Sequence, residues 1–186
     1  MHKQIKKLLL INSFFLLGAN LFAPLYALYV QQIDAHIVNV GAIWGVYILS
    51  VGLFVLFIRK FENNLKKTSK YLILGFFLRA LGWVGYLFAA RLWHLYVIQI
   101  VLALGEAFGT PAYRSLFSNY LDKGQYSSEW GLDIFFTCII TSIAAFAGGL
   151  IVQYYNFKTL FVIMICFSLL SVFLALQYTS VLSDKA

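Results

Sequence analysis

Residues 38–58 read VNVGAIWGVYILSVGLFVLFI, a stretch without a charged side chain that is as long as a membrane-spanning helix. An α-helix rises about 1.5 Å per residue, so about 20 apolar residues match the roughly 30 Å hydrocarbon core of a bilayer. Similar stretches of comparable length lie on both sides, at 8–31, 71–90, 93–113, 131–153 and 158–179. The sequence therefore predicts six membrane-spanning helices.

The composition leaves little room for anything else. The chain has 186 residues, of which 62% are hydrophobic, and the six spans occupy most of it. The first span is longer than the 7–15 apolar residues of a signal peptide, so we expect it to be retained as a helix. In lipid only helices or closed barrels satisfy the backbone, and these runs are too long for barrel strands. We therefore expect an all-α membrane protein with a single domain over residues 1–186.

The basic residues predict the orientation of the chain. With the N-terminus in the cytoplasm, eleven of them lie at the inner side and two, Arg91 and Lys158, lie outside. The eleven are Lys3, Lys6, Lys7, Arg59, Lys60, Lys66, Lys67, Lys70, Arg114, Lys123 and Lys185. The positive-inside rule then places both termini in the cytoplasm. This asymmetry accounts for the net charge of +7 without a nucleic-acid partner. We expect a multi-pass protein of the plasma (inner) membrane.

The connectors divide the chain into two three-helix units, about 8–90 and 93–179. The first unit begins inside and ends outside, whereas the second begins outside and ends inside. The hydropathy pattern therefore predicts two inverted three-helix repeats, an arrangement typical of secondary transporters.

Three stretches resemble the major facilitator superfamily (MFS), and specifically the N-terminal six-helix half of its drug-exporter-type members. They are GANLFAPLYALYV at 18–30, GEAFGTPAYR at 105–114 and AGGLIVQYYNFKTLF at 147–161. The connector FIRKFENNLKKTSK at 57–70 departs from the family pattern, because the basic residues are present but the glycines and the aspartate are missing or displaced. The resemblance implies a transporter of a small solute that works by alternating access.

The number of spans is the larger departure from the family. Members usually have twelve spans in two six-helix halves related by an axis along the membrane normal. We expect a homodimer or a second six-helix half to supply the missing spans. The alternatives are a piece of a longer protein or a transport-incompetent fragment.

Two charged residues interrupt the apolar spans. Arg79 lies nine residues from Lys70, and Glu106 lies eight from Arg114, which puts both about 12–14 Å from the inner membrane edge. Opposite charges at one depth on consecutive antiparallel helices are expected to meet. A charge at this depth is costly, so it indicates function by default, whereas a permanent ion pair joining the helices is the structural alternative. In the functional case Glu106 exchanges its Arg79 contact for a proton or a cationic substrate.

Other polar residues extend the predicted solute path. Gln99, Glu106, Thr110 and Tyr113 recur at spacings of seven, four and three, and therefore share one face of a helix. The family resemblance adds weight to Asn20, Gln99 and Glu106, because helices one and four line the path in that family. At the inner mouth, the candidates for an ion-pair gate are Arg114, Glu129 and Asp133.

Small residues mark the predicted helix contacts and the contact with a second half. The candidates are Gly41, Gly45, Gly105, Gly109, Gly148 and Gly149. The first four form two G-x-x-x-G pairs, which allow helices to approach closely.

No enzyme motif is recognisable. The sequence lacks a zinc-protease helix, a phosphate loop and a serine nucleophile elbow, and its two cysteines have no metal-ligand spacing. We expect no metal and no cofactor. The leading hypothesis is a proton- or cation-coupled transporter subunit. A six-helix binding or assembly subunit that depends on another partner is the alternative.

Overall fold

A computed structural model describes residues 2–58 and 65–183, and over these ranges the chain consists of helices joined by short connectors. The helices are α1 (Lys3–Asn20), η1 (Ala23–Leu25), α2 (Tyr26–Ile33), α3 (Ile37–Ile58), α4 (Leu65–Leu87), α5 (Leu92–Ser118), α6 (Tyr126–Tyr154) and α7 (Phe157–Ser183). Six of the described segments are long and apolar enough to cross a membrane, the first combining α1, η1 and α2. The prediction of six spans in an all-α fold is confirmed. Arg59, Lys60 and Lys185, which contribute to the predicted orientation, lie outside the described residues.

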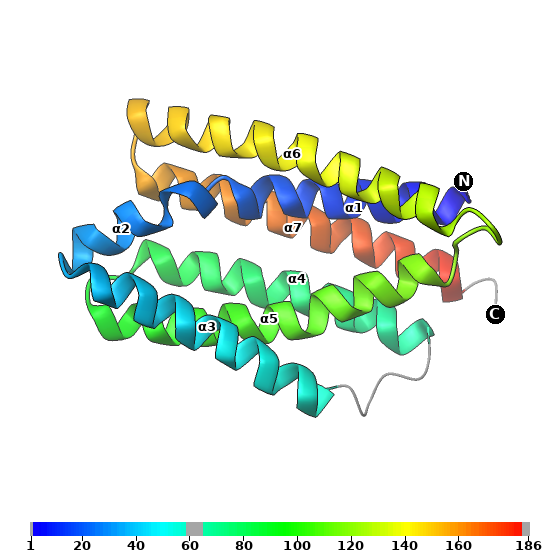
Figure 1. Cartoon of the computed structure of the whole chain (residues 1–186), viewed down its shortest axis with the longest axis horizontal. Helices are drawn as coiled ribbons and strands as arrows, with labels where there is room; N and C mark the ends of the chain where they lie inside the picture. The colour runs from blue at the N-terminus through cyan, green and yellow to red at the C-terminus, as the bar shows by residue number, and fades with distance from the viewer. Residues whose placement is uncertain (1, 59–64, 184–186) are drawn as a thin grey trace.

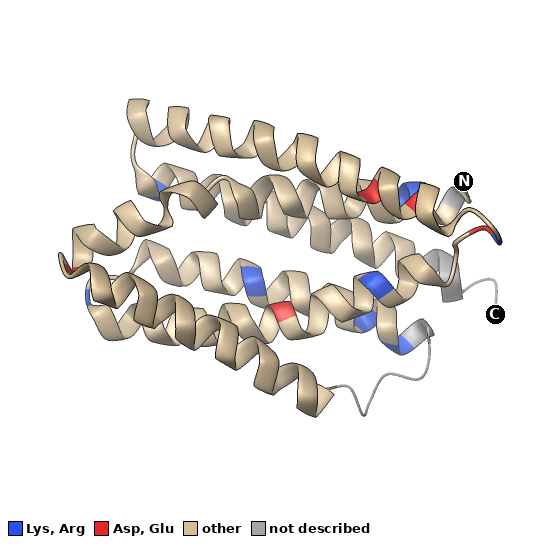
Figure 2. Cartoon of the chain, in the orientation of Figure 1, with Lys and Arg blue, Asp and Glu red and all other residues tan. Residues whose placement is uncertain are grey.

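The helices run roughly side by side in two groups, with α1, α6 and α7 in one and α3, α4 and α5 in the other (Figure 1). Helix α4 packs against both α5 and α7 and so joins the groups. Helix α1 begins and α7 ends at the same end of the bundle, here called the terminal end (Figure 1). Charged residues gather near the two ends, and a small group lies mid-bundle on α4 and α5 (Figure 2).

Burial is uneven among the spans. Only 11% of the most apolar window of α3, and likewise of α6, is buried, against 33–44% for the other spans. Exposed apolar side chains on these two helices include Ile48, Phe135 and Phe146. Helices α3 and α6 therefore contribute least to the core of this chain and most to its outer surface.

Glycines set the close crossing of α4 and α5. A Cβ atom added to Gly75 would lie 2.4 Å from the Cα of Gly109, and one added to Gly105 would lie 3.0 Å from the carbonyl oxygen of Gly75. By contrast, an added Cβ on Gly41 or Gly45 would meet nothing within 4 Å. The predicted glycine pair on α5 thus lies at a helix contact, and the pair on α3 faces away from the described chain.

The first span is broken near its middle. Helix α1 ends at Asn20 and the chain continues through η1, which contains Pro24, before α2 begins. Proline lacks the N–H that a continuous helix requires. Helix α6 packs against this break so closely that a Cβ on Gly148 would lie 1.9 Å from the carbonyl oxygen of Leu21. Gly149 beside it would meet nothing within 4 Å.

Candidate functional site

A cavity of about 960 Å³ lies between the two helix groups. Its walls come from α1 to α6, and none of the described α7 side chains is among the residues that line it. All six residues of the predicted path line this cavity, namely Asn20, Arg79, Gln99, Glu106, Thr110 and Tyr113. A volume of this size falls at the upper end of the range typical of small-molecule sites.

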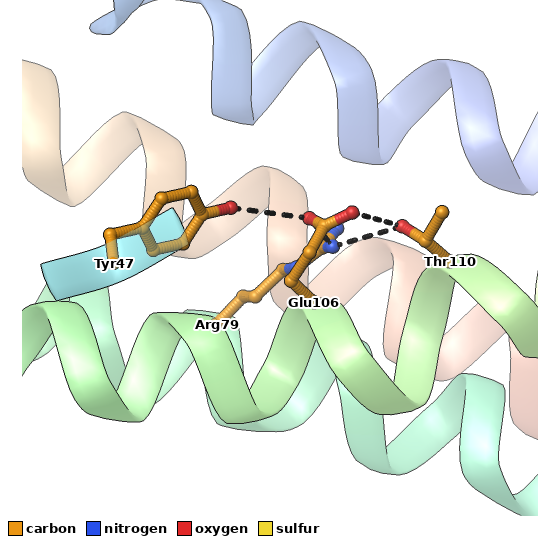
Figure 3. Close-up of polar contacts among 4 residues, drawn as sticks. All are labelled: Tyr47, Arg79, Glu106 and Thr110. Atoms are coloured by element: carbon orange, nitrogen blue, oxygen red, sulfur yellow. Dashed lines mark hydrogen bonds and ion pairs between the residues drawn. The ribbon is translucent and has the colours of Figure 1, made fainter. Parts of the chain in front are cut away.

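The mid-bundle charges form an ion pair within the cavity wall. A guanidinium nitrogen of Arg79 contacts Oε2 of Glu106, and the same nitrogen lies 3.3 Å from Oγ1 of Thr110. The Thr110 hydroxyl donates to Oε1 of Glu106, and the Tyr47 hydroxyl lies 3.4 Å from Oε2. Figure 3 shows these four side chains, from α3, α4 and α5, converging on the carboxylate.

The two partners of the pair differ in exposure. The side chain of Arg79 is 7% exposed and that of Glu106 is 28% exposed. The Arg79 guanidinium lies over the ring of Phe15, 4.4 Å from its centroid. A Cβ on Gly105 would come within 2.8 Å of Cγ of Arg79, so the absence of a side chain there makes room for the arginine. The arginine is therefore held between α1 and α5, and within this pair the carboxylate is the more exposed group on the cavity wall.

Away from the terminal end, aromatic rings pack beside the cavity. Phe22, in the break of the first span, makes edge contacts with Tyr29, Tyr86 and Phe161 at centroid distances of 5.1–5.6 Å. The Tyr29 hydroxyl donates to the carbonyl oxygen of Tyr86 at 2.9 Å, and Nε2 of Gln99 donates to the Tyr86 hydroxyl at 3.1 Å. Gln99 thus supports this aromatic packing as well as lining the cavity.

Asn20 has a more local contact. Its Nδ2 donates to the carbonyl oxygen of Leu16, one turn earlier in α1, at 2.9 Å. It still lines the cavity at the last residue of that helix. Its carboxamide satisfies a helix carbonyl next to the break in the first span.

The three predicted gate residues have different surroundings. Asp133 and Arg114 both line the cavity, and Asp133 accepts a hydrogen bond of 2.5 Å from the hydroxyl of Tyr113. Glu129 is buried and does not line the cavity, and its Oε2 accepts a hydrogen bond of 2.9 Å from the backbone N–H of Asp122. Helices α5 and α6 are therefore bridged by a tyrosine and an aspartate, while Glu129 stabilises the connector between them.

The match to a known family fits this architecture. A family model described as Major Facilitator Superfamily matches residues 8–184. The chain belongs to this superfamily. The comparison with curated proteins gave no match. As an MFS protein the chain is a multi-pass integral membrane protein of the secondary-transporter kind and not an enzyme, and its relatives carry small solutes.

The cavity lining also includes aromatic residues that were not among the predicted site residues. Tyr26, Trp44, Tyr47 and Trp83 line the cavity beside the ion pair. Trp44 and Tyr47 are three residues apart and so share a face of α3. Within residues 2–58 and 65–183, no three His, Cys, Asp or Glu side chains are grouped so that they could hold a metal ion.

Proposed function

We propose that this MFS chain is a transporter subunit that moves a small solute by alternating access together with a second six-helix half. The observation that carries the proposal is the cavity of about 960 Å³ with the Glu106 carboxylate in its wall, about midway along α5. Ionisable residues inside the membrane that face a cavity typically mark a substrate or ion pathway. We further propose the plasma (inner) membrane as its location.

The helix contacts support two inverted three-helix repeats. If the repeats are equivalent, α1 corresponds to α5, α3 to α6 and α4 to α7. The α1–α7 contact then has its counterpart in α4–α5, and the α1–α6 contact in α3–α5. The α4–α7 contact maps onto itself. An axis in the membrane plane that relates two such units is the inverted-repeat arrangement of secondary transporters.

The exposed faces of α3 and α6 support a second half. Helices α3 and α6 are the least buried spans, and Gly41, Gly45 and Gly149 on them have no neighbour within 4 Å of an added Cβ. Small residues allow helices of another half to approach closely. We propose a second copy of the chain in this position, so that two cavities face each other across a two-fold axis.

The second copy can be tested directly. Native mass spectrometry of the protein released from lipid nanodiscs is expected to show a dimer. Replacing Gly45 with Trp, on the face of α3 that lacks contacts, is expected to convert the dimer to a monomer. A wild-type chain that is strictly monomeric at all protein concentrations contradicts the dimer.

We propose that Glu106 is the coupling group. Its side chain is four times as exposed as that of Arg79, which the Phe15 ring and the glycine face of α5 hold in place. In this mechanism Arg79 remains fixed, and Glu106 releases it when a proton or a cation binds the carboxylate. The Tyr113–Asp133 bridge, with Arg114 beside it, acts as a gate at the cytoplasmic end.

The flux experiment uses proteoliposomes on a solid-supported membrane. A panel of small solutes is first screened for a rise in melting temperature, and the compounds that stabilise the chain are then tested for transport currents. We expect wild-type currents that depend on the pH or cation gradient and disappear in Glu106→Gln. Asp34→Asn, a matched carboxylate-to-amide change in the α2–α3 connector, is the control and should transport normally.

Other outcomes separate the alternatives. Normal transport by Glu106→Gln removes Glu106 from the coupling mechanism. Solute binding without flux in a wild-type dimer contradicts the transporter and favours the binding-subunit alternative. Labelling of Lys123→Cys only by reagents added on the cytoplasmic side is expected, and labelling only from the outside contradicts the proposed orientation.

A further inference from the structure

We infer that the solute combines a cationic nitrogen, held at Glu106 and the rings of Trp44 and Tyr47, with a hydrogen-bond acceptor directed to the indole N–H of Trp83. This inference rests on the proposed function and specifies the chemistry of the same cavity. Its parts come from charge exposure, ring geometry and one unpartnered donor.

Charge exposure indicates the sign of the solute. The cavity meets the Glu106 carboxylate, because the paired Arg79 is nearly covered by its neighbours. Three donors reach the carboxylate among the described residues, from Tyr47, Arg79 and Thr110. A carboxylate offers about four acceptor sites, of which these donors use three. A cation without N–H groups uses no acceptor site, so it can lie beside Glu106 while these hydrogen bonds remain. An anionic solute at this point of the cavity would instead have to displace Glu106 from Arg79. The other arginine of the cavity lining, Arg114, lies near the Asp133 carboxylate.

Aromatic rings lie next to this carboxylate. Trp44 is 50% exposed and lines the cavity, with its ring centroid 5.2 Å from that of Tyr47 and 5.7 Å from that of Tyr26. Tyr47 links the group to Glu106 through its hydroxyl. Faces of Trp and Tyr attract cations, and quaternary ammonium groups in particular are bound by such rings. The three rings with Glu106 therefore form one side of a site for an organic cation.

Trp83 supplies the second recognition element. It lines the cavity and is 8% exposed, and its Nε1 has no hydrogen-bond partner among the described residues. Buried indole N–H groups usually find a partner, because an unpaired buried donor is costly. The ring is held by Tyr86, with centroids 6.1 Å apart, and by Phe22, 6.5 Å away. Nε1 is itself shielded, so the proposal requires these two rings to move aside when the acceptor binds.

The spacing along α4 gives an approximate separation of the two elements, because Arg79 on this helix contacts Glu106. Trp83 follows Arg79 by four residues, which is about 6 Å along the helix axis and on the same face. The solute is thus expected to carry its acceptor oxygen about one helical turn beyond its cationic nitrogen. A flexible amino ester or amino ketone has this chemistry.

Three probes of one shape test the inference in equilibrium binding to the purified full chain by calorimetry. The first is (2-acetoxyethyl)trimethylammonium. Pentyltrimethylammonium keeps the charge and lacks the oxygens, and 3,3-dimethylbutyl acetate keeps the oxygens and lacks the charge. We expect the first probe to bind about tenfold more tightly than either of the others, which corresponds to about 1.4 kcal/mol.

Variants assign each preference to its residue. Trp83→Phe keeps an aromatic ring and removes the N–H. In this variant the first probe should lose its advantage over pentyltrimethylammonium and keep its advantage over the neutral ester. In Trp44→Leu and in Glu106→Gln the first probe should lose its advantage over the neutral ester and keep its advantage over pentyltrimethylammonium. Trp93→Phe, at an exposed tryptophan that does not line the main cavity, is the control and should bind all three probes like the wild type.

Clear results overturn the inference. Equal affinity for the charged and neutral esters contradicts the site for a cationic nitrogen. An unchanged preference of Trp83→Phe for the charged ester over pentyltrimethylammonium contradicts the acceptor contact at Trp83. If none of the three probes binds with a dissociation constant below about 10 mM, a very weak affinity, the site as a whole is rejected. Because binding is measured without a membrane gradient, a chain that binds with this selectivity but shows no flux contradicts the transport proposal and leaves this one standing.

Discussion

Gly148→Ala tests whether α6 is locked against the break in the first span. An added Cβ would lie 1.9 Å from the carbonyl oxygen of Leu21 and 2.8 Å from its carbonyl carbon. Carbon–oxygen contacts in proteins are ordinarily about 3.3–3.6 Å, so the two backbones must separate by about 1.4 Å. The obstacle is backbone rather than a flexible side chain, so no rotamer change can relieve it.

The expected cost follows from two opposing effects. Overpacking typically costs about 1–3 kcal/mol, and a backbone clash belongs in the upper part of that range. Replacing glycine with alanine within a helix stabilises the folded chain by about 0.5–1 kcal/mol. Gly149→Ala shares this second effect and meets nothing within 4 Å, so it isolates the clash. We expect Gly148→Ala to be about 2–3 kcal/mol less stable than Gly149→Ala.

The measurement is unfolding of the purified chain by sodium dodecyl sulfate, followed by circular dichroism, with the wild type and both variants in the same detergent. Gly149→Ala should match the wild type or exceed it slightly. If both alanine variants unfold at the same detergent fraction, α6 does not pack closely on the break in the first span.

Three further changes test other contacts, the first two by the same unfolding assay and the third by thermal unfolding. Gly75→Ala places a Cβ 2.4 Å from the Cα of Gly109 and should destabilise the chain by about 2 kcal/mol, whereas Gly109→Ala, with 3.5 Å to its nearest neighbour, should be neutral. Tyr113→Phe removes the hydrogen bond to Asp133 and should cost about 1–2 kcal/mol, and an unchanged stability would rule out that bond. The backbone N–H of His36 lowers the pKa of Asp34 below its usual 3.8, so this group contributes stability above about pH 4 that is lost as the pH falls through the folded pKa. Asp34→Asn should therefore lower the melting temperature at pH 7 and leave it unchanged at pH 2, and an equal effect at both values would contradict this assignment.

The spans and the central ion pair could be predicted because both depend on position along the chain. Hydropathy marks the segments that fit the hydrocarbon core, and equal depth on consecutive antiparallel helices brings Arg79 and Glu106 together. The helices themselves extend further than the apolar stretches. Helix α5 runs to Ser118 and α6 begins at Tyr126, because a helix can continue into the polar interface where hydropathy falls.

The lateral contacts could not be predicted, because they depend on how each helix is rotated about its axis. Helix α3 is apolar on all sides, so nothing in its sequence shows that Tyr47 points to Glu106. For the same reason the sequence does not distinguish Gly148, which packs closely on Leu21, from Gly149, which does not. Glu129 and Asp133, neighbouring acids near the terminal end, were equivalent candidates in the sequence, yet Glu129 is buried beneath the α5–α6 connector.

The shared position of the start of α1 and the end of α7 has an evolutionary consequence (Figure 1). Two copies of this six-helix unit joined head to tail would need only a short linker on one side of the bilayer and no additional crossing. Both copies would then insert in the same direction, which is the relationship between the two halves of a twelve-span transporter. Duplication and fusion can thus produce the larger architecture without inverting any part of the chain. A tandem gene built in this way would also allow one cavity to be altered while the other is kept intact.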